Sequence, residues 1–271
     1  MIILLLSLAF LFVFYLFYLI FWWSWKKNCQ PMFKEEQTIV FGHRGSPGLI
    51  TENTIPSFQK AIDQGVEGLE FDIRLSKDKQ IVVFHDATLK RLSDRNEAIS
   101  DLSLTELQAV ELYKKEGQTE EVYIPSLKDM VPLLHQAKVL NIEIKSEGLF
   151  KGHDILKPLI KFLNIYLIDN KCIVSSFNPL ILMRLRLQRP ETVIGFLYNR
   201  NRLFHGWDNM VWMLRVQPEN LHIHHSLLDS WVVRWARKKG MRINSYTIND
   251  KNEFDGAKAD GVFTDNIEYI K

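Results

Sequence analysis

Short apolar runs alternate with longer segments of helical periodicity along most of the chain. Between many of the runs lie amphipathic segments, at 54–64, 126–137, 154–168, 179–188, 229–239 and 250–257. This alternation is typical of βαβ units. About eight such strands in about 240 residues favour a closed (β/α)8 TIM barrel. Asn53 is the expected N-cap of the first helix. The strand candidates are 38–42, 67–73, 80–84, 139–145, 172–176, 192–197, 220–224, 242–247 and 261–264.

The first 25 residues contain no Asp, Glu, Lys or Arg. As a helix they would span roughly 37 Å, enough to cross a hydrocarbon core of about 30 Å. A cleaved signal peptide is the alternative, but no basic residue precedes the apolar core, and the Trp-rich end resembles an interfacial belt. Because Lys26 and Lys27 flank that end, the following domain is expected on the cytoplasmic face of the membrane.

The sequence therefore divides into a transmembrane anchor (1–25), a juxtamembrane linker (26–37) and a barrel domain (38–271). Residues 87–125 interrupt the alternation and are rich in charged side chains. We expect them to form a small insertion after the strand that ends at His85-Asp86, folded over one edge of the site.

Charge and cysteine content exclude some classes of function. The chain has 34 Lys and Arg against 32 Asp and Glu, a net charge of +2, which gives no support for a nucleic-acid partner. The two cysteines, Cys29 and Cys172, form no disulfide-like or metal-binding pattern.

Carboxylates occur at alternate positions in two of the predicted strands. Glu70 and Asp72 project from one face because a strand has a period of two residues. They indicate either a site for a hard cation with oxygen ligands or a solvated or salt-bridged strand. Glu143 and Lys145 repeat the arrangement: Glu143 is a third candidate ligand and Lys145 a candidate phosphate contact, with an ordinary ion pair as the alternative.

Histidines stand at the ends of two other strand candidates. His43 and His85 are each followed by an ionisable residue, Arg44 and Asp86. Two imidazoles that titrate near neutral pH can share the proton transfers of phosphodiester cleavage, although a lone histidine is more often structural. The guanidinium of Arg44 matches the geometry of phosphate oxygens. We expect these clusters to meet at the carboxyl ends of the barrel strands.

A third group of histidines, His222, His224 and His225, lies within a single run. Their spacing matches no established zinc pattern, so a zinc site is disfavoured. His222 and His224 share one face of the predicted strand, so that one of them is expected to line the barrel mouth.

In this order, the motifs resemble those of the glycerophosphodiester phosphodiesterase family over residues 38–271. The matching stretches are Gly42-His43-Arg44-Gly45, Glu52-Asn53-Thr54, Glu70-x-Asp72, His85-Asp86, Glu143-x-Lys145 and Asp260-Gly261-Val262-Phe263-Thr264-Asp265. The family usually has Trp-Thr-x-Asn near its C-terminus, where this chain has Tyr246-Thr247-Ile248-Asn249. The resemblance therefore implies that Tyr246 forms an aromatic wall of the substrate pocket in place of the family's tryptophan.

The resemblance implies a TIM barrel and a role for each matched residue. His43 and His85 would be the acid/base pair, and Glu70, Asp72 and Glu143 would bind one divalent cation, Mg2+ or Ca2+. Arg44, Lys145 and Tyr246 would contact substrate, with Glu52 and Asn249 supporting these residues from outside the substrate pocket.

The expected activity is metal-dependent hydrolysis of a glycerophosphodiester to an alcohol and glycerol 3-phosphate. Membrane-associated relatives suggest an alternative, hydrolysis of a lysophospholipid to lysophosphatidic acid. A catalytically silent, lipid-binding barrel at the membrane is the alternative from another class. The intact candidate site residues argue against it.

Overall fold

Eight parallel strands in the described part of the chain close into a barrel. The computed structural model describes residues 2–21, 23, 25–28, 30–33, 37–199 and 207–270. β1 pairs in parallel with both β2 and β9, which closes the sheet. The predicted (β/α)8 TIM barrel is thus confirmed. Its strands are β1 (Ile39–His43), β2 (Gly68–Leu75), β4 (Val139–Ile144), β5 (Cys172–Ser176), β6 (Val193–Leu197), β7 (Asn220–His224), β8 (Arg242–Tyr246) and β9 (Gly261–Thr264).

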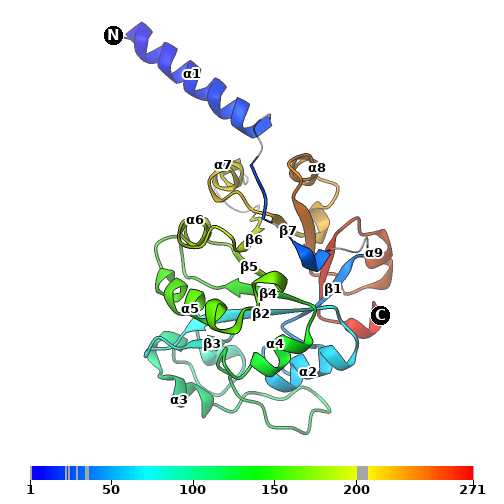
Figure 1. Ribbon diagram of the computed structural model, residues 1–271. Coiled ribbons are helices and arrows are strands. Elements are labelled where there is room, and N and C mark those ends of the chain that lie inside the picture. Colours follow the sequence, from blue (N-terminus) through cyan, green and yellow to red (C-terminus); the bar gives the residue numbers. More distant parts are fainter. Residues whose placement is uncertain are drawn as a thin grey trace.

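Helices surround the barrel, as Figure 1 shows. Apolar side chains on the outer face of each strand pack against them; Leu69, Phe71 and Ile73 of β2 are fully buried there. The main core therefore lies between strands and helices. Inside the barrel, a smaller apolar cluster that includes Phe41, Val139 and Phe263 lies on the same strand faces as the polar residues of the site. The helices are α2 (Ile55–Asp63), α4 (Val131–Gln136), α5 (Leu156–Tyr166), α6 (Pro179–Gln188), α7 (Trp207–Val216), α8 (Trp231–Lys238) and α9 (Lys251–Gly256), with short 3-10 turns η1 (Pro31–Phe33), η4 (His153–Ile155), η5 (Asp169–Lys171), η7 (His225–Leu227) and η8 (Ile267–Tyr269).

One strand does not belong to the barrel. β3 (Ile81–Val83) pairs antiparallel with the end of β2, from Ile73 to Leu75. The expectation that His85 ends a parallel barrel strand is therefore wrong. β2 extends past the barrel rim and β3 returns along it, so that the Phe84 amide donates to the Asp72 carbonyl at 3.0 Å. This hairpin brings His85 back to the barrel mouth.

The N-cap of α2 also differs from the expectation. Thr54 is the cap, and its hydroxyl accepts from the Ser57 amide. Asn53 instead adopts a left-handed conformation, φ 57°, and its Nδ2 donates to Asp72 Oδ2 at 2.8 Å. Its side chain is thus committed to the barrel interior and is not available to cap the helix.

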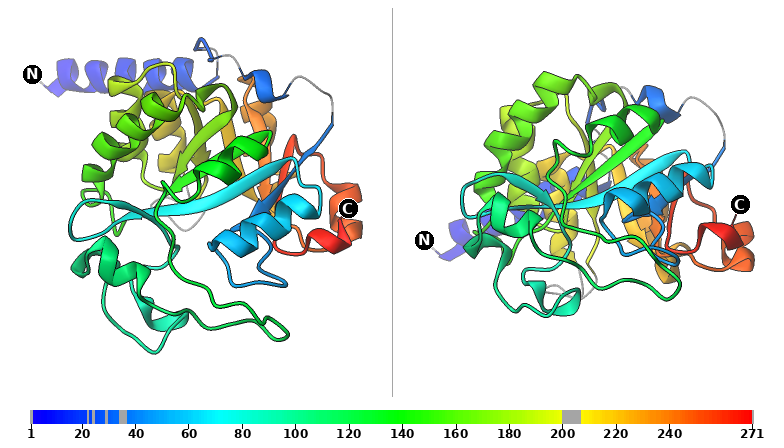
Figure 2. Two further views of the ribbon diagram at one scale, coloured as in Figure 1. Left: turned by 60° about the horizontal axis from the view of Figure 1, so that its bottom comes forward. Right: turned by 90° about the horizontal axis from the view of Figure 1, so that it is seen from below.

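Residues 87–125, where we expected an insertion, contain η2 (Leu89–Arg91), η3 (Ile99–Asp101) and α3 (Leu104–Gln108). Ser103 and Glu106 form a capping box at the start of α3. Figure 2 shows α3 and its neighbouring loops projecting from one side of the barrel. The segment packs against β3 and the residue after it in a small apolar core, formed by Val82, Phe84, Leu89, Ile99, Leu102, Leu107, Val110, Leu112, Val122 and Ile124.

The N-terminal helix α1 (Ile2–Phe21) projects from the barrel and contacts it at α7 (Figure 1). Within the described part of the chain, no helix qualifies by length and apolar character as a membrane span. The predicted transmembrane anchor is therefore not confirmed. Residues 1, 22, 24, 29 and 34–36 of the predicted anchor and linker lie outside the described residues.

Candidate active site

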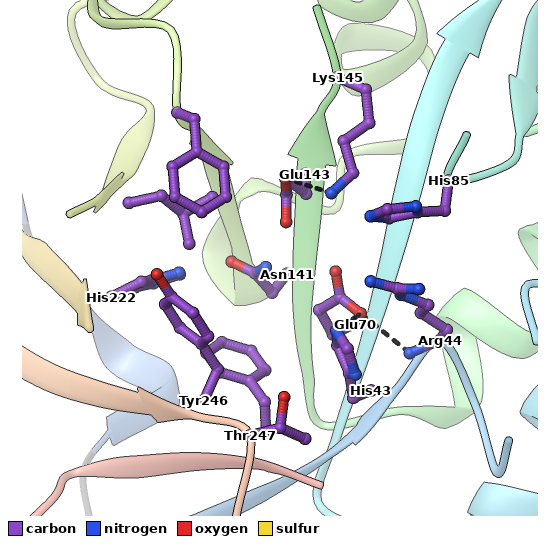
Figure 3. Close-up of a pocket in the computed structure, with 13 residues that line it drawn as sticks. His43, Arg44, Glu70, His85, Asn141, Glu143, Lys145, His222, Tyr246 and Thr247 are labelled. Carbon is purple, nitrogen blue, oxygen red and sulfur yellow. Dashed lines mark hydrogen bonds and ion pairs between the residues drawn. The ribbon is translucent and has the colours of Figure 1, made fainter. Parts of the chain in front are cut away.

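A cavity of about 140 Å³ opens at the carboxyl ends of the barrel strands. Figure 3 shows that charged side chains from β1, β2 and β4 form one wall and that Tyr246 faces them from the other side. Seven of the ten predicted site residues line it, while Asp72, Glu52 and Asn249 lie behind the wall. The lining residues are His43, Arg44, Glu70, His85, Asn141, Glu143, Lys145, Phe177, Leu197, His222, Tyr246, Thr247 and Phe263.

Glu70, Asp72 and Glu143 form an acidic triad inside the barrel. Asp72 and Glu143 are register partners in β2 and β4, and Glu70 lies one inward position below Asp72. One oxygen from each residue lies within 4.8 Å of the others. Among the described residues, no other group of three or more His, Cys, Asp or Glu side chains is gathered closely enough to hold a metal.

The electrostatics of the triad fit a bound cation. Glu70 Oε1 is buried and has no hydrogen-bond partner among the described residues. Burial and the nearby charge of Asp72 raise the pKa of Glu70 to about 8. A divalent cation would favour the charged form, and carboxylate oxygens are the ligands that Mg2+ and Ca2+ prefer. The triad could therefore bind a divalent metal ion.

Two basic side chains also offset the charge of the triad. Lys145 Nζ lies 2.9 Å from Asp72 Oδ1 and 2.5 Å from Glu143 Oε1. Arg44 Nε lies 3.3 Å from Asp72 Oδ2. Burial alone would raise the pKa of Asp72, but Lys145 and Arg44 hold it well below its usual range. Lys145 therefore forms the ion pair considered from the sequence and also lines the cavity.

His43 is held by a carboxylate that sequence reasoning did not assign. Its Nδ1 lies 2.7 Å from Asp265 Oδ1, and Asn249 Nδ2 donates to Asp265 Oδ2 at 3.2 Å. His43 Nε2 lies 3.9 Å from Glu70 Oε2. Burial opposes the charged form, but Glu70 and Asp265 outweigh it and raise the pKa of His43. The signal for Asp265 was its place directly after the last strand.

His85 has a different environment. Its Nδ1 lies 2.5 Å from Asp86 Oδ1, and two nitrogens of Arg74 donate to its carbonyl at 2.9 and 2.7 Å. Burial and the charge of Lys145 lower the pKa of His85. The two imidazoles therefore have pKa values shifted in opposite directions, which is characteristic of sites that need both an acid and a base.

An ionic chain joins His85 to Arg44 through the segment 87–125. Arg91, in η2, donates to Asp86 Oδ2 at 2.5 Å and to both oxygens of Glu52 at 2.7 and 2.8 Å. Glu52 Oε1 also accepts from Arg44 Nη1 at 3.0 Å. Glu52 thus supports Arg44 from outside the cavity. Sequence reasoning did not single out Arg91, because nothing in its spacing indicated two acidic partners.

Residues 43–269 match the sequence model of the glycerophosphoryl diester phosphodiesterase family. The chain belongs to this family. The glycerophosphodiester phosphodiesterase of Caldanaerobacter subterraneus subsp. tengcongensis is 31% identical over 239 residues, which cover 86% of this chain and 96% of that protein. A lysophospholipase D from Mus musculus is 26% identical over 260 residues, 82% of each chain.

Solved structures of the family share the fold. A phosphodiesterase from Oleispira antarctica, in complex with the product sn-glycerol-3-phosphate, has a TM-score of 0.74 to this chain and 29% sequence identity. The match covers 86% of this chain and 94% of the other. A family member from Thermotoga maritima has a TM-score of 0.68 at 28% identity.

Proposed function

We propose that this protein hydrolyses glycerophosphodiesters to an alcohol and glycerol 3-phosphate. One cavity carries the proposal: it holds an acidic triad, two basic side chains and two histidines whose pKa values are shifted in opposite directions. The similarity of the chain to phosphodiesterases, including one solved with glycerol 3-phosphate, supports the same substrate class.

The cavity suggests a role for each group. His43 and His85 would transfer protons to and from the reacting oxygens, and their carboxylate partners Asp265 and Asp86 fix the orientation of each ring. Arg44 and Lys145 would hold the phosphate, because both line the cavity with positively charged side chains.

Glu70, Asp72 and Glu143 would hold the divalent cation, which we propose to be Mg2+ or Ca2+. When bound, such an ion stabilises negative charge on phosphate oxygens. Tyr246 would form the wall beside the substrate, since its ring lines the cavity opposite the triad. Asn249 would support the site through Asp265, to which its Nδ2 donates a hydrogen bond.

Contact with a lipid bilayer, which the lysophospholipid alternative requires, is supported by a separate observation. Apolar side chains of α1 are exposed, among them Leu6 at 66% and Phe10 at 71%. A large exposed apolar surface is typical of a membrane or partner contact. We propose that α1 attaches the domain to a lipid bilayer, with the barrel on the cytoplasmic side where Lys26 and Lys27 are favoured. A bilayer would bring lysolipids within reach of the cavity.

Purified protein should release choline from glycerophosphocholine, and a chelator should abolish the release until Mg2+ or Ca2+ is restored. Choline release that resists the chelator would refute the metal requirement.

His43→Ala and His85→Ala should each lower kcat/KM by about 10²- to 10⁴-fold, because a proton transfer is lost. His135→Ala, an exposed histidine on α4, is the matched control and should retain full activity. Wild-type activity in either cavity variant would refute the acid/base assignment.

Arg91→Met should lower kcat/KM for glycerophosphocholine by about 10-fold or more, because Asp86 and Glu52 lose their shared charged partner. Arg95→Met is the matched control: Arg95 lies in the same segment but pairs only with the exposed Glu97 in the described structure. Steady-state kinetics of both variants checks the expectation. Equal activities would show that the ionic chain does not support the site.

The membrane proposal is tested by flotation with vesicles of phosphatidylcholine and phosphatidylserine. The full chain should float with the vesicles, and the double variant Leu8→Glu/Phe12→Glu should stay in solution because charge opposes insertion of α1. Leu187→Glu is the control, since Leu187 is 74% exposed on α6. Flotation of the α1 double variant with wild-type efficiency would exclude α1 as the attachment site.

A further inference from the structure

The inner end of the cavity has a polar floor. Asn141 of β4 and His222 of β7 both line the cavity and are only 2% and 0% exposed. Figure 3 shows the Asn141 amide and the His222 ring turned toward one another across it. Barrel interiors are usually filled by branched apolar side chains, so two polar groups at this depth require an explanation.

Asn141 presents an unused acceptor. Its Nδ2 donates to Ser175 Oγ at 3.1 Å. Its Oδ1 is buried and accepts no hydrogen bond from any residue that the structure describes. Buried carbonyl oxygens are normally paired, and one left unpaired beside a cavity is a candidate ligand contact.

His222 presents an unused donor. Asn244 Nδ2 lies 3.1 Å from His222 Nε2 and donates to it, so Nε2 carries no proton and the proton of the neutral ring lies on Nδ1. Burial keeps the ring neutral by lowering the pKa of His222 to about 3. Within the described structure, Nδ1 has no hydrogen-bond partner.

Two glycines make room for this pair. A Cβ at position 195 would lie 2.5 Å from His222 Nε2, and a Cβ at position 261 would lie 2.5 Å from Asn244 Oδ1. Any side chain larger than hydrogen at either position would displace the ring or the amide that fixes its tautomer. The floor is therefore built into the strands around it.

A hydroxyl group is the chemical match for this floor, because it donates one hydrogen bond and accepts another. We propose that Asn141 Oδ1 accepts from, and His222 Nδ1 donates to, the terminal hydroxyl of the substrate's glycerol moiety. This assignment rests on the proposed function. The two side chains bind and select substrate and take no part in proton transfer to or from the reacting oxygens.

The order of residues along β4 identifies which hydroxyl is bound. Asn141, Glu143 and Lys145 share the inward face, with Lys145 nearest the mouth and Asn141 deepest. If Lys145 and Arg44 hold the phosphate, the group that reaches Asn141 is the hydroxyl farthest from phosphorus. Phe263 lines the cavity beside His222, and its ring centroid lies 4.8 Å from that of the buried Phe41. An acyl chain on that hydroxyl would meet these rings, so the floor selects unacylated glycerophosphodiesters over 1-acyl lysophospholipids.

The test compares glycerophosphocholine with the phosphocholine diester of propane-1,2-diol, which has hydrogen in place of the terminal hydroxyl. Wild-type kcat/KM should be about 10- to 100-fold lower for the deoxy substrate, because Asn141 and His222 stay unpaired. 1-Acyl lysophosphatidylcholine should be a poorer substrate than glycerophosphocholine. Equal kcat/KM for the first two substrates would overturn the proposal while leaving the proposed function intact.

His222→Phe and Asn141→Leu keep the approximate shape of each side chain and remove its hydrogen bond. Each should lose activity on glycerophosphocholine but keep it on the deoxy substrate, which also shows that the variant is folded. His222→Gln, which retains a donor, should recover part of the preference. His135→Phe, at an exposed position, should keep all of it. Equal losses on both substrates would assign the pair a purely structural role and overturn the proposal.

Product binding separates this proposal from the proposed function. Calorimetry should show tighter binding of glycerol 3-phosphate than of propane-1,2-diol 1-phosphate to wild-type protein, by a similar 10- to 100-fold factor. If neither diester is hydrolysed, the proposed function fails, but this ratio still decides whether the floor recognises a hydroxyl. Equal affinities would overturn the assignment.

Discussion

Three carboxylates buried side by side inside a barrel would repel one another, and each costs free energy to remove from water. The surroundings of Glu70, Asp72 and Glu143 follow from this constraint. Arg44 and Lys145 contribute positive charge, and Asn53 donates to Asp72 from the loop before α2. Even so, the pKa of Glu70 is raised to about 8. The remaining imbalance is what a divalent cation would neutralise, and it makes the triad the centre of the site.

The site depends on two parts of the fold that contribute differently. The barrel strands position the triad and His43 on a rigid inner face. The β2–β3 hairpin and the segment 87–125 position His85, and Arg91 ties that segment to Asp86 and Glu52. Through these contacts the segment supports both His85, a candidate acid/base group, and Arg44, which we propose to bind phosphate. Changes in its packing should reach the chemistry through this ionic chain.

Strand parity predicted the triad well, because a period of two residues places Glu70 and Asp72 on one face whatever the detailed packing. The family motifs likewise brought His43, His85 and Lys145 to one cavity. Parity could not show that β3 runs antiparallel outside the barrel. The antiparallel direction of β3 depends on how far β2 extends beyond the barrel rim, and that length is set by tertiary structure. The preference of Asn for helix N-caps also led to the wrong assignment of Asn53, because that preference takes no account of the hydrogen bond that Asn53 donates to Asp72.

The residues that sequence reasoning missed have partners far away in the chain. Asp265 contacts His43 across 222 positions, and Arg91 contacts Glu52 across 39. The floor pair is a further case. From the sequence, His222 was a disfavoured zinc ligand and one of two histidines expected to line the barrel mouth. Its proposed role in substrate binding depends on Gly195 in a neighbouring strand and on Asn244 in another. Such relationships become visible only when register and side-chain direction are known.

We propose that the acidic triad holds one divalent cation at the substrate pocket. Anomalous diffraction from a crystal of the full chain grown with Mn2+, a hard cation that suits the same oxygen ligands, tests it most directly. We expect a single strong anomalous peak bounded by carboxylate oxygens of Glu70, Asp72 and Glu143, and we expect Glu143→Gln to abolish it. A triad without anomalous density at saturating Mn2+, or a dominant peak beside His224 and His225, would contradict it.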